Sequence, residues 1–125
     1  MTADDTVQTL DTSVLSALYD SVGGDDAFVA DLVETYLGDG TAQLAAIEAA
    51  ARDRDAEALV RPAHTLKSAS RTVGATRLGE LSRQIEMLGR SGSTTGAAEL
   101  AAEARTEWSD VEAALRAWLS DGAAT

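Results

Sequence analysis

LVRPAHTLKSASRTV, residues 59–73, has two different faces when it is wound as an α-helix. One face carries apolar and small residues at intervals of four, three, four and three: Leu59, Ala63, Leu66, Ser70 and Val73. In a helix this spacing forms one buried stripe, and its small members allow a neighbouring helix to approach closely. The stretch therefore predicts a helix packed inside a bundle of helices.

Similar stripes and capping residues lie on both sides of this stretch and predict further helices. The second stripe of the chain consists of Phe28, Leu32, Val33, Tyr36 and Leu37. The expected helical segments run from Asp11 or Ser13 to Gly23, from Asp25 to Leu37, from Thr41 to Arg52, from Asp55 to Val73, from Thr76 to Gly89 and from Ala97 to Leu119.

Two features are expected to interrupt these helices. The Gly38-Asp39-Gly40 run predicts a break or a kink between the second and third segments. Pro62 removes one backbone hydrogen bond, at a cost of up to ~3 kcal/mol in a helix interior, so a kink or a restart is expected there. Gly74 is expected to end its helix in the left-handed conformation.

Short connections between helices of similar length favour antiparallel neighbours. The predicted fold is all-α: an antiparallel four-helix bundle with additional N-terminal helical segments. Residues 10–119 are expected to form this bundle, between a flexible N-terminus at 1–9 and a flexible C-terminus at 120–125. Trp108 and Trp118 are expected to pack between helices rather than to form a binding platform.

The composition excludes several classes of function. The net charge of −11 disfavours nucleic acid and anionic membranes as partners, since both need clustered basic residues. There is no cysteine, and no apolar run approaches the roughly 20 residues of a membrane span. The acidic start, MTADD, does not resemble a signal peptide. We therefore expect a soluble cytoplasmic protein.

The second face of residues 59–73 collects polar side chains around His64. Arg61, Lys67, Ser68 and Arg71 stand at positions that fall within about 60° of the His64 direction on a helix. His64 is the only histidine of the chain, and Lys67 is its only lysine. The sequence thus places its one imidazole among three cations on an otherwise acidic molecule.

Imidazole suits a reversible bond to a phosphoryl group near neutral pH, because its reference pKa of about 6.5 keeps the nucleophilic neutral form abundant. A phosphoryl group adds about two negative charges, which nearby cations would stabilise. A solvated face without chemistry is the alternative. A zinc site is disfavoured because one histidine and no cysteine leave only carboxylates as ligands. A Ser–His–Asp triad is disfavoured because helical bundles rarely provide an oxyanion hole.

The stretch AHTLKSAS at residues 63–70, followed by VGA at 73–75 and by Leu78, resembles the signature of histidine-containing phosphotransfer (HPt) domains. The resemblance covers roughly residues 10–119. It implies that His64 accepts a phosphoryl group from an aspartyl phosphate and passes it to another aspartate. It also implies that Lys67 steadies the phosphoryl oxygens. The family usually has glycine after this lysine, whereas this chain has serine.

The resemblance implies a phosphoryl carrier, not an enzyme with a kinase domain, that holds no cofactor and no metal. Its expected partners are receiver domains of response regulators and of hybrid histidine kinases. Two alternatives stay open at this point. One is the histidine-bearing domain of a chemotaxis-type kinase, and the other is a helical adaptor whose histidine has no chemistry.

Overall fold

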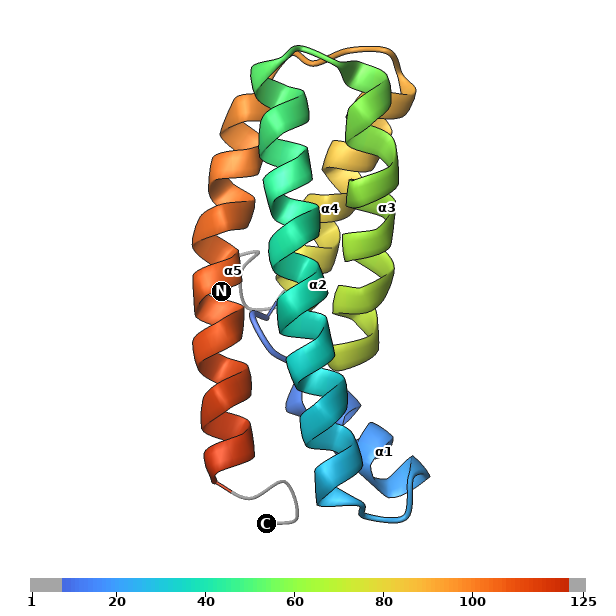
Figure 1. Ribbon diagram of the computed structural model, residues 1–125, viewed down its shortest axis with the longest axis vertical. Coiled ribbons are helices and arrows are strands. Elements are labelled where there is room, and N and C mark those ends of the chain that lie inside the picture. Colours follow the sequence, from blue (N-terminus) through green and yellow to red (C-terminus); the bar gives the residue numbers. More distant parts are fainter. Residues whose placement is uncertain (1–7, 122–125) are drawn as a thin grey trace, which may run out of the picture.

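The computed structural model describes residues 8–121, and all regular structure within that range is helical (Figure 1). Most of the expected helix boundaries are confirmed to within one or two residues. The helices are α1 (Thr12–Ser21), α2 (Asp26–Arg52), α3 (Ala56–Val73), α4 (Thr76–Arg90) and α5 (Ala97–Ser120). No helix in the described range is long and apolar enough to cross a bilayer.

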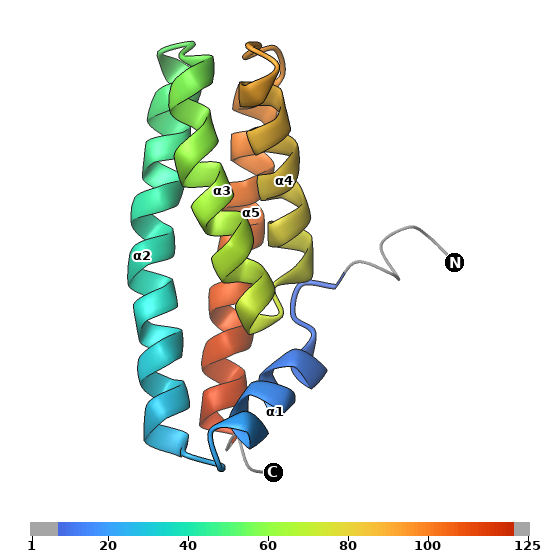
Figure 2. The same ribbon diagram turned by 90° about the vertical axis from the view of Figure 1, so that its right-hand side faces the viewer.

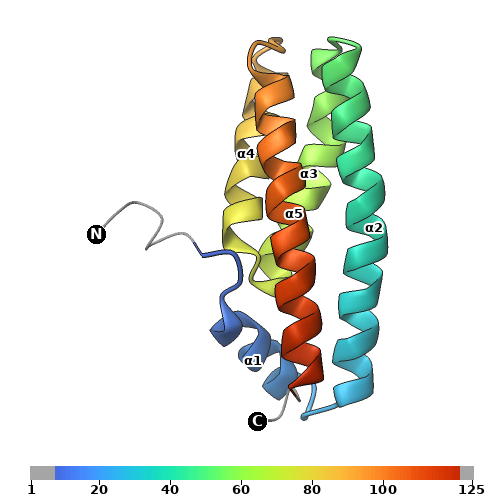
Figure 3. The same cartoon turned by 90° about the vertical axis from the view of Figure 1, so that its left-hand side faces the viewer.

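Helices α2 to α5 form the predicted four-helix bundle, in which neighbours along the chain run antiparallel (Figure 1). Each of them packs on the next, and α5 returns to pack on α2, which closes the bundle. The short α1 lies obliquely across one end, against α2 and α3 (Figure 2). Residues 8–11, which precede α1, lie beside α4 and α5 (Figure 3).

Aspartates begin three of the helices, as expected. Asp25 accepts a hydrogen bond from the backbone N–H of Phe28 at 3.0 Å, and Asp55 accepts one from Ala58 at 3.1 Å. Asp11 caps α1 in the same way through Ser13. These bonds satisfy backbone donors that the first turn of a helix leaves free, which is typically worth about 1 kcal/mol each.

Gly74 ends α3 with a φ of 83°, the predicted left-handed conformation. The site also leaves no room for a side chain, because a Cβ atom would lie 2.5 Å from the backbone oxygen of Asp11. The backbone N–H of Asp11 donates a 2.7 Å hydrogen bond to the carbonyl of Gly74. This glycine therefore fixes both the end of α3 and the approach of α1.

The core contains the whole predicted stripe of α3, from Leu59 to Val73. Ser70, its polar member, lies 2.8 Å from the hydroxyl of Tyr36 on α2. The Tyr36 ring contacts the ring of Trp108 on α5, with centroids 5.3 Å apart. Trp108 is buried and Trp118 is half-buried against the core, so both tryptophans serve packing as expected.

The predicted interruption at residues 38–40 is wrong, because α2 runs unbroken through both glycines. Gly40 is buried against Trp108, and a Cβ atom there would overlap the indole ring. Glycine in a helix costs roughly 1 kcal/mol relative to alanine, which a long packed helix can absorb. Gly40 therefore serves the packing of α2 on α5.

Two further expectations are corrected in the details. Of the kink or restart expected at Pro62, the restart does not occur, because α3 is one helix from Ala56 to Val73, and Pro62 is itself buried. Phe28 is 50% exposed and does not belong to the buried stripe of α2, because Val29 occupies the inward position. Residues 1–7 and 122–125, which hold most of the termini expected to be flexible, lie outside the described residues.

Candidate functional site

His64 projects from α3 between two buried members of the stripe, Ala63 and Leu66. Its own side chain is 53% exposed. This placement agrees with the two faces predicted for residues 59–73, with the apolar stripe buried and His64 on the polar face. An exposed imidazole on a rigid helix can meet a reacting group of another protein.

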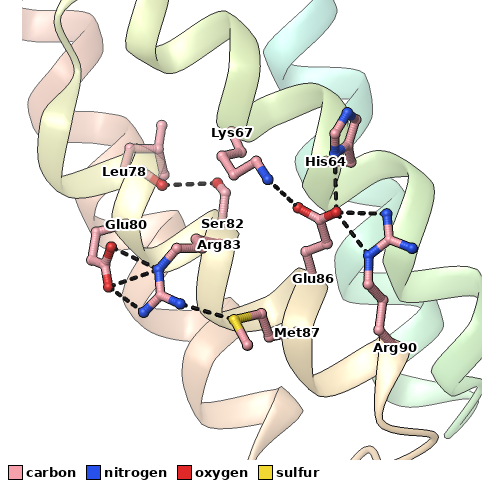
Figure 4. A network of polar contacts seen from close by, with 9 residues as sticks. All are labelled: His64, Lys67, Leu78, Glu80, Ser82, Arg83, Glu86, Met87 and Arg90. Atoms are coloured by element: carbon pink, nitrogen blue, oxygen red, sulfur yellow. Dashed lines mark hydrogen bonds and ion pairs between the residues drawn. The ribbon is translucent and has the colours of Figure 1, made fainter.

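The imidazole is held by Glu86 of α4, a residue that sequence reasoning did not select as part of the site. His64 Nδ1 lies 3.0 Å from Glu86 Oε2, and Lys67 Nζ lies 2.6 Å from Glu86 Oε1 (Figure 4). Arg90 donates to Oε2 through Nε at 3.0 Å and through Nη2 at 2.8 Å. One carboxylate thus gathers three basic side chains from two helices.

Glu86 is only 4% exposed, yet it remains ionised. The hydrogen bond from Lys67 contributes most to this, and those from Arg90 and His64 add to it. Together they outweigh the effect of burial and lower the pKa of Glu86 to about 2. The site therefore has a fixed negative charge beneath the imidazole at neutral pH.

This carboxylate determines which nitrogen of His64 is available. An ionised carboxylate only accepts hydrogen bonds, so the neutral imidazole carries its proton on Nδ1. The lone pair then lies on Nε2, which points away from Glu86 (Figure 4). The arrangement leaves one nucleophilic nitrogen on the solvent side of the ring.

The structure brings together some of the expected site residues and leaves others apart. Lys67 lies next to His64, but its side chain is only 18% exposed and it is bound to Glu86. A lysine on the polar face of a helix would be expected to be exposed and to make no contact with the core; here Lys67 is mostly buried and pairs with the buried Glu86. Ser68, Arg61 and Arg71 are exposed on α3. Within residues 8–121, none of these three has a hydrogen bond or ion pair with Glu86 or His64.

On the neighbouring surface of α4, Arg83 bonds to two side chains of the same helix. Its guanidinium donates to both carboxylate oxygens of Glu80 and to the sulfur of Met87, the latter at 2.9 Å (Figure 4). Met87 is 56% exposed, beside Glu86 in the sequence. In the described part of the chain, no group of three acidic, histidine or cysteine side chains is placed to hold a metal ion.

The family model of the Hpt domain matches residues 31–118. The chain belongs to the Hpt-domain family. Its structure also resembles the crystal structure of histidine-containing phosphotransfer protein B (HptB) from Pseudomonas aeruginosa PAO1, with a TM-score of 0.83 and 26% sequence identity. The likeness covers 90% of this chain and 96% of that one. No match was found among curated proteins.

Family and fold together make this Hpt domain a histidine phosphotransfer protein of a phosphorelay. The resemblance inferred from residues 63–78 is thereby confirmed. Proteins of this family are phosphocarriers and not kinases, and neither of the two alternatives, the histidine-bearing domain of a chemotaxis-type kinase and the helical adaptor, is favoured.

The two residues that sequence reasoning missed, Glu86 and Arg90, left only a local signal. They stand four residues apart on α4, the spacing of an ordinary ion pair on a helix surface. Nothing in that spacing indicates a contact with His64, which lies 22 residues earlier in the chain. The resemblance to the HPt signature also extends to Ile85-Glu86 and to the turn at residues 89–92, but it assigned neither Glu86 nor Arg90 to the site.

Proposed function

We propose that Nε2 of His64 is the atom that carries the phosphoryl group. It would attack the phosphorus of an aspartyl phosphate on a receiver domain. The N–P bond forms as the P–O bond breaks, and the receiver's carboxylate is released. The reverse step on a second receiver regenerates free His64. The observation that carries this proposal is the contact between Nδ1 and Glu86, which leaves Nε2 facing solvent.

Glu86 has two roles in this proposal. It holds the ring in one orientation, and its charge stabilises the imidazole as positive charge develops during attack on phosphorus. Because the pKa of Glu86 is about 2, the carboxylate keeps this charge throughout the physiological range. Glu86 acts through the imidazole and is a positioning residue.

Lys67 would supply the positive charge for the phosphoryl oxygens. Its ammonium group is paired with the carboxylate of Glu86, which also binds His64, and Lys67 lies one helical turn from His64. The ammonium group of Lys67 would need only a small side-chain movement to reach the phosphoryl oxygens on His64. Arg90 would meanwhile continue to neutralise the charge of Glu86. Arg61 and Arg71 are exposed on the same helix and would add longer-range attraction for an anionic partner surface. Ser68 would lie under the docked receiver.

The partners in this proposal are receiver domains of response regulators and hybrid histidine kinases in the cytoplasm. The chain itself would need no nucleotide, metal or other cofactor. It would also have no kinase activity of its own.

The test is transfer from receiver domains of the same genome, labelled with radioactive acetyl phosphate, to this protein. The wild type should gain label that is lost in acid and survives base, as a phosphoramidate does. His64→Gln should gain none, yet unfold within about 0.5 kcal/mol of the wild type, because the side chain is 53% exposed and a glutamine amide is also a donor for Glu86. Acid-stable label, or label on His64→Gln, would contradict the proposed acceptor.

A parallel incubation with a histidine kinase domain and ATP, without any receiver, tests the route of phosphorylation. The relay mechanism predicts that label appears only when a receiver is present. Direct labelling by the kinase domain would instead indicate the chemotaxis-type arrangement.

A further inference from the structure

A second polar site lies in a groove between α4, α5 and the segment that precedes α1. The groove has a volume of about 1020 Å³, and none of the residues that line it belongs to α3. Its charged residues are Arg77 on α4 and three acidic residues on α5: Glu103, Glu107 and Asp110. The groove is therefore separate from His64 and has its own chemistry.

Glu107 is the central feature of this groove, because it is buried and poorly paired. It is 6% exposed, and its nearest cation is Arg77, whose Nε lies 3.7 Å from Oε1. Among the described residues, no group donates a hydrogen bond to Oε2. Hydrogen bonds to charged groups are normally shorter than 3.2 Å, so neither oxygen has a close cationic donor of the kind that Glu86 has.

The surroundings make this carboxylate unfavourable as it stands. Burial raises the pKa of Glu107, and the negative charge of Asp110 adds to this. The side chain of Thr9 and the charge of Arg77 oppose the shift without cancelling it. A buried carboxylate with an unused oxygen costs free energy that a further donor would recover.

The shape and charge of the groove define the donor that would fit. Glu103, Glu107 and Asp110 follow one another at spacings of four and three residues, so they share one face of α5. The unpartnered Oε2 of Glu107 lies among these carboxylates, so the donor that fits carries a positive charge. Leu81 and Ala102 also line the groove, and they offer apolar surface for an aliphatic chain.

We propose that this groove is a second binding site, which takes an arginine side chain from a partner polypeptide and places its guanidinium on Glu107. A guanidinium has five donors in a planar fork, so it can reach Oε2 of Glu107 and a flanking carboxylate together. The volume exceeds what one side chain fills, and it leaves room for the neighbouring residues of a peptide. The site does not depend on the chemistry proposed for His64.

The experiment titrates the full-length protein with the peptide acetyl-Gly-Ala-Arg-Ala-Gly-amide and follows its backbone amide signals by NMR. Saturable shifts are expected at residues 103–110. The same peptide with citrulline in place of arginine keeps the shape without the charge, and it should not bind. Glu107→Gln should weaken binding of the arginine peptide about tenfold, since a hydrogen bond between charged groups is lost.

Two protein variants test whether binding belongs to this groove alone. Glu99→Gln removes an exposed charge from α5 outside the groove and should bind the peptide as the wild type does. His64→Gln should also bind it unchanged, which separates this site from phosphotransfer. The proposal is overturned by the absence of saturable shifts up to about 10 mM peptide. It is also overturned if Glu107→Gln binds with wild-type affinity.

A last arm distinguishes a partner polypeptide from a free small cation. The peptide should bind more tightly than acetyl-arginine-amide, because its flanking residues also occupy the groove. Equal affinities would show that the site reads a free guanidinium compound, and the assignment to a partner polypeptide would be wrong.

Discussion

Glu86 and Glu107 are both buried carboxylates, but their environments drive their protonation in opposite directions. Glu86 receives Lys67, Arg90 and His64, and its pKa falls to about 2. Glu107 has one cation at 3.7 Å, and burial raises its pKa. Both side chains are almost fully covered, at 4% and 6% exposure; burial has the largest influence on the pKa of Glu107, whereas at Glu86 the hydrogen bonds from basic side chains outweigh it. A buried acid in this bundle is stabilising only where basic side chains reach it.

The largest effect is expected from Glu86→Ala. This change leaves Lys67 partly buried beside His64 and Arg90 without its acceptor, so the free energy of unfolding at pH 7 should fall by about 2–3 kcal/mol. Phosphoryl transfer should also slow, because the ring of His64 loses its fixed orientation. Urea unfolding and the transfer assay measure the two effects separately.

Glu80→Ala is the matched control, since Glu80 is 39% exposed and forms its ion pair with Arg83, three residues further along the same helix. It should cost less than about 1 kcal/mol. The pH dependence adds a second check. The pKa of Glu86 is lowered on folding, so its stabilisation is present above pH 4.5 and is lost as the pH falls toward 2. If Glu86→Ala lowers the free energy of unfolding no more than Glu80→Ala does, Glu86 is not specially stabilised by its basic partners, and it does not differ from Glu107 in this respect.

Lys67→Ala should have the next largest effect, on both stability and transfer. It removes the largest single cause of the lowered pKa of Glu86, so the free energy of unfolding should fall by about 1–2 kcal/mol. Transfer should slow roughly tenfold, because the phosphoryl oxygens lose their nearest cation.

Lys67→Arg keeps the positive charge and should recover most of the stability lost in Lys67→Ala. If Lys67→Ala transfers at the wild-type rate from every receiver, Lys67 serves only to hold Glu86. The pairing of Lys67 with Glu86 would then matter for the stability of the fold and not for phosphotransfer.

The sequence was sufficient for features that depend on residues close together in the chain. The stripe from Leu59 to Val73, the capping by Asp25 and Asp55, and the end of α3 at Gly74 all follow from spacings of a few residues. His64 and Lys67 were found for the same reason, since both stand on one face of one helix. Local periodicity therefore determined the fold class and half of the site.

Features that depend on how two helices meet could not be predicted in this way. The contact of Gly40 with Trp108 turned an expected break into a packing position. Glu86 meets His64 only because α3 and α4 pack in one particular register. Glu107 looked like one acidic residue among many, and its burial depends on the segment before α1 and on α4. Register between helices is a tertiary property, which periodicity within one helix does not specify.

Glu107→Gln is expected to stabilise the protein at neutral pH, in contrast to any loss at Glu86. The pKa of Glu107 is raised on folding, so the folded state favours the protonated form and stability falls as the pH rises through that pKa. The neutral amide avoids this cost and should gain about 1 kcal/mol at pH 8.

The same variant should gain little at pH 4, where Glu107 of the wild type is already largely protonated. Glu99→Gln, an exposed position on the same helix, should change stability by less than about 0.5 kcal/mol at both pH values. A loss of stability in Glu107→Gln at pH 8 would mean that Glu107 is paired as favourably as Glu86. The proposed arginine site would then lose its main support, which is that Glu107 has no close cationic donor.

The smallest effect on stability is expected at Ser68, which is exposed on α3, one helical turn after His64. Ser68→Gly should cost only about 0.5 kcal/mol, because the residue is exposed in the middle of α3 and glycine weakens a helix. Its consequence should instead appear in partner choice. Removing the side chain opens the approach to Nε2 of His64, so more members of a panel of phosphorylated receivers should transfer their phosphoryl group to the variant.

Ser68→Ala is the control, since it removes the hydroxyl but keeps the Cβ atom. If only the glycine variant broadens transfer, the side chain acts by its volume. If the alanine variant does so too, the hydroxyl itself restricts the partners. An unchanged preference in both variants would show that receivers are selected by the buried arrangement at Glu86 and by surfaces further from His64, and that serine at this position is neutral.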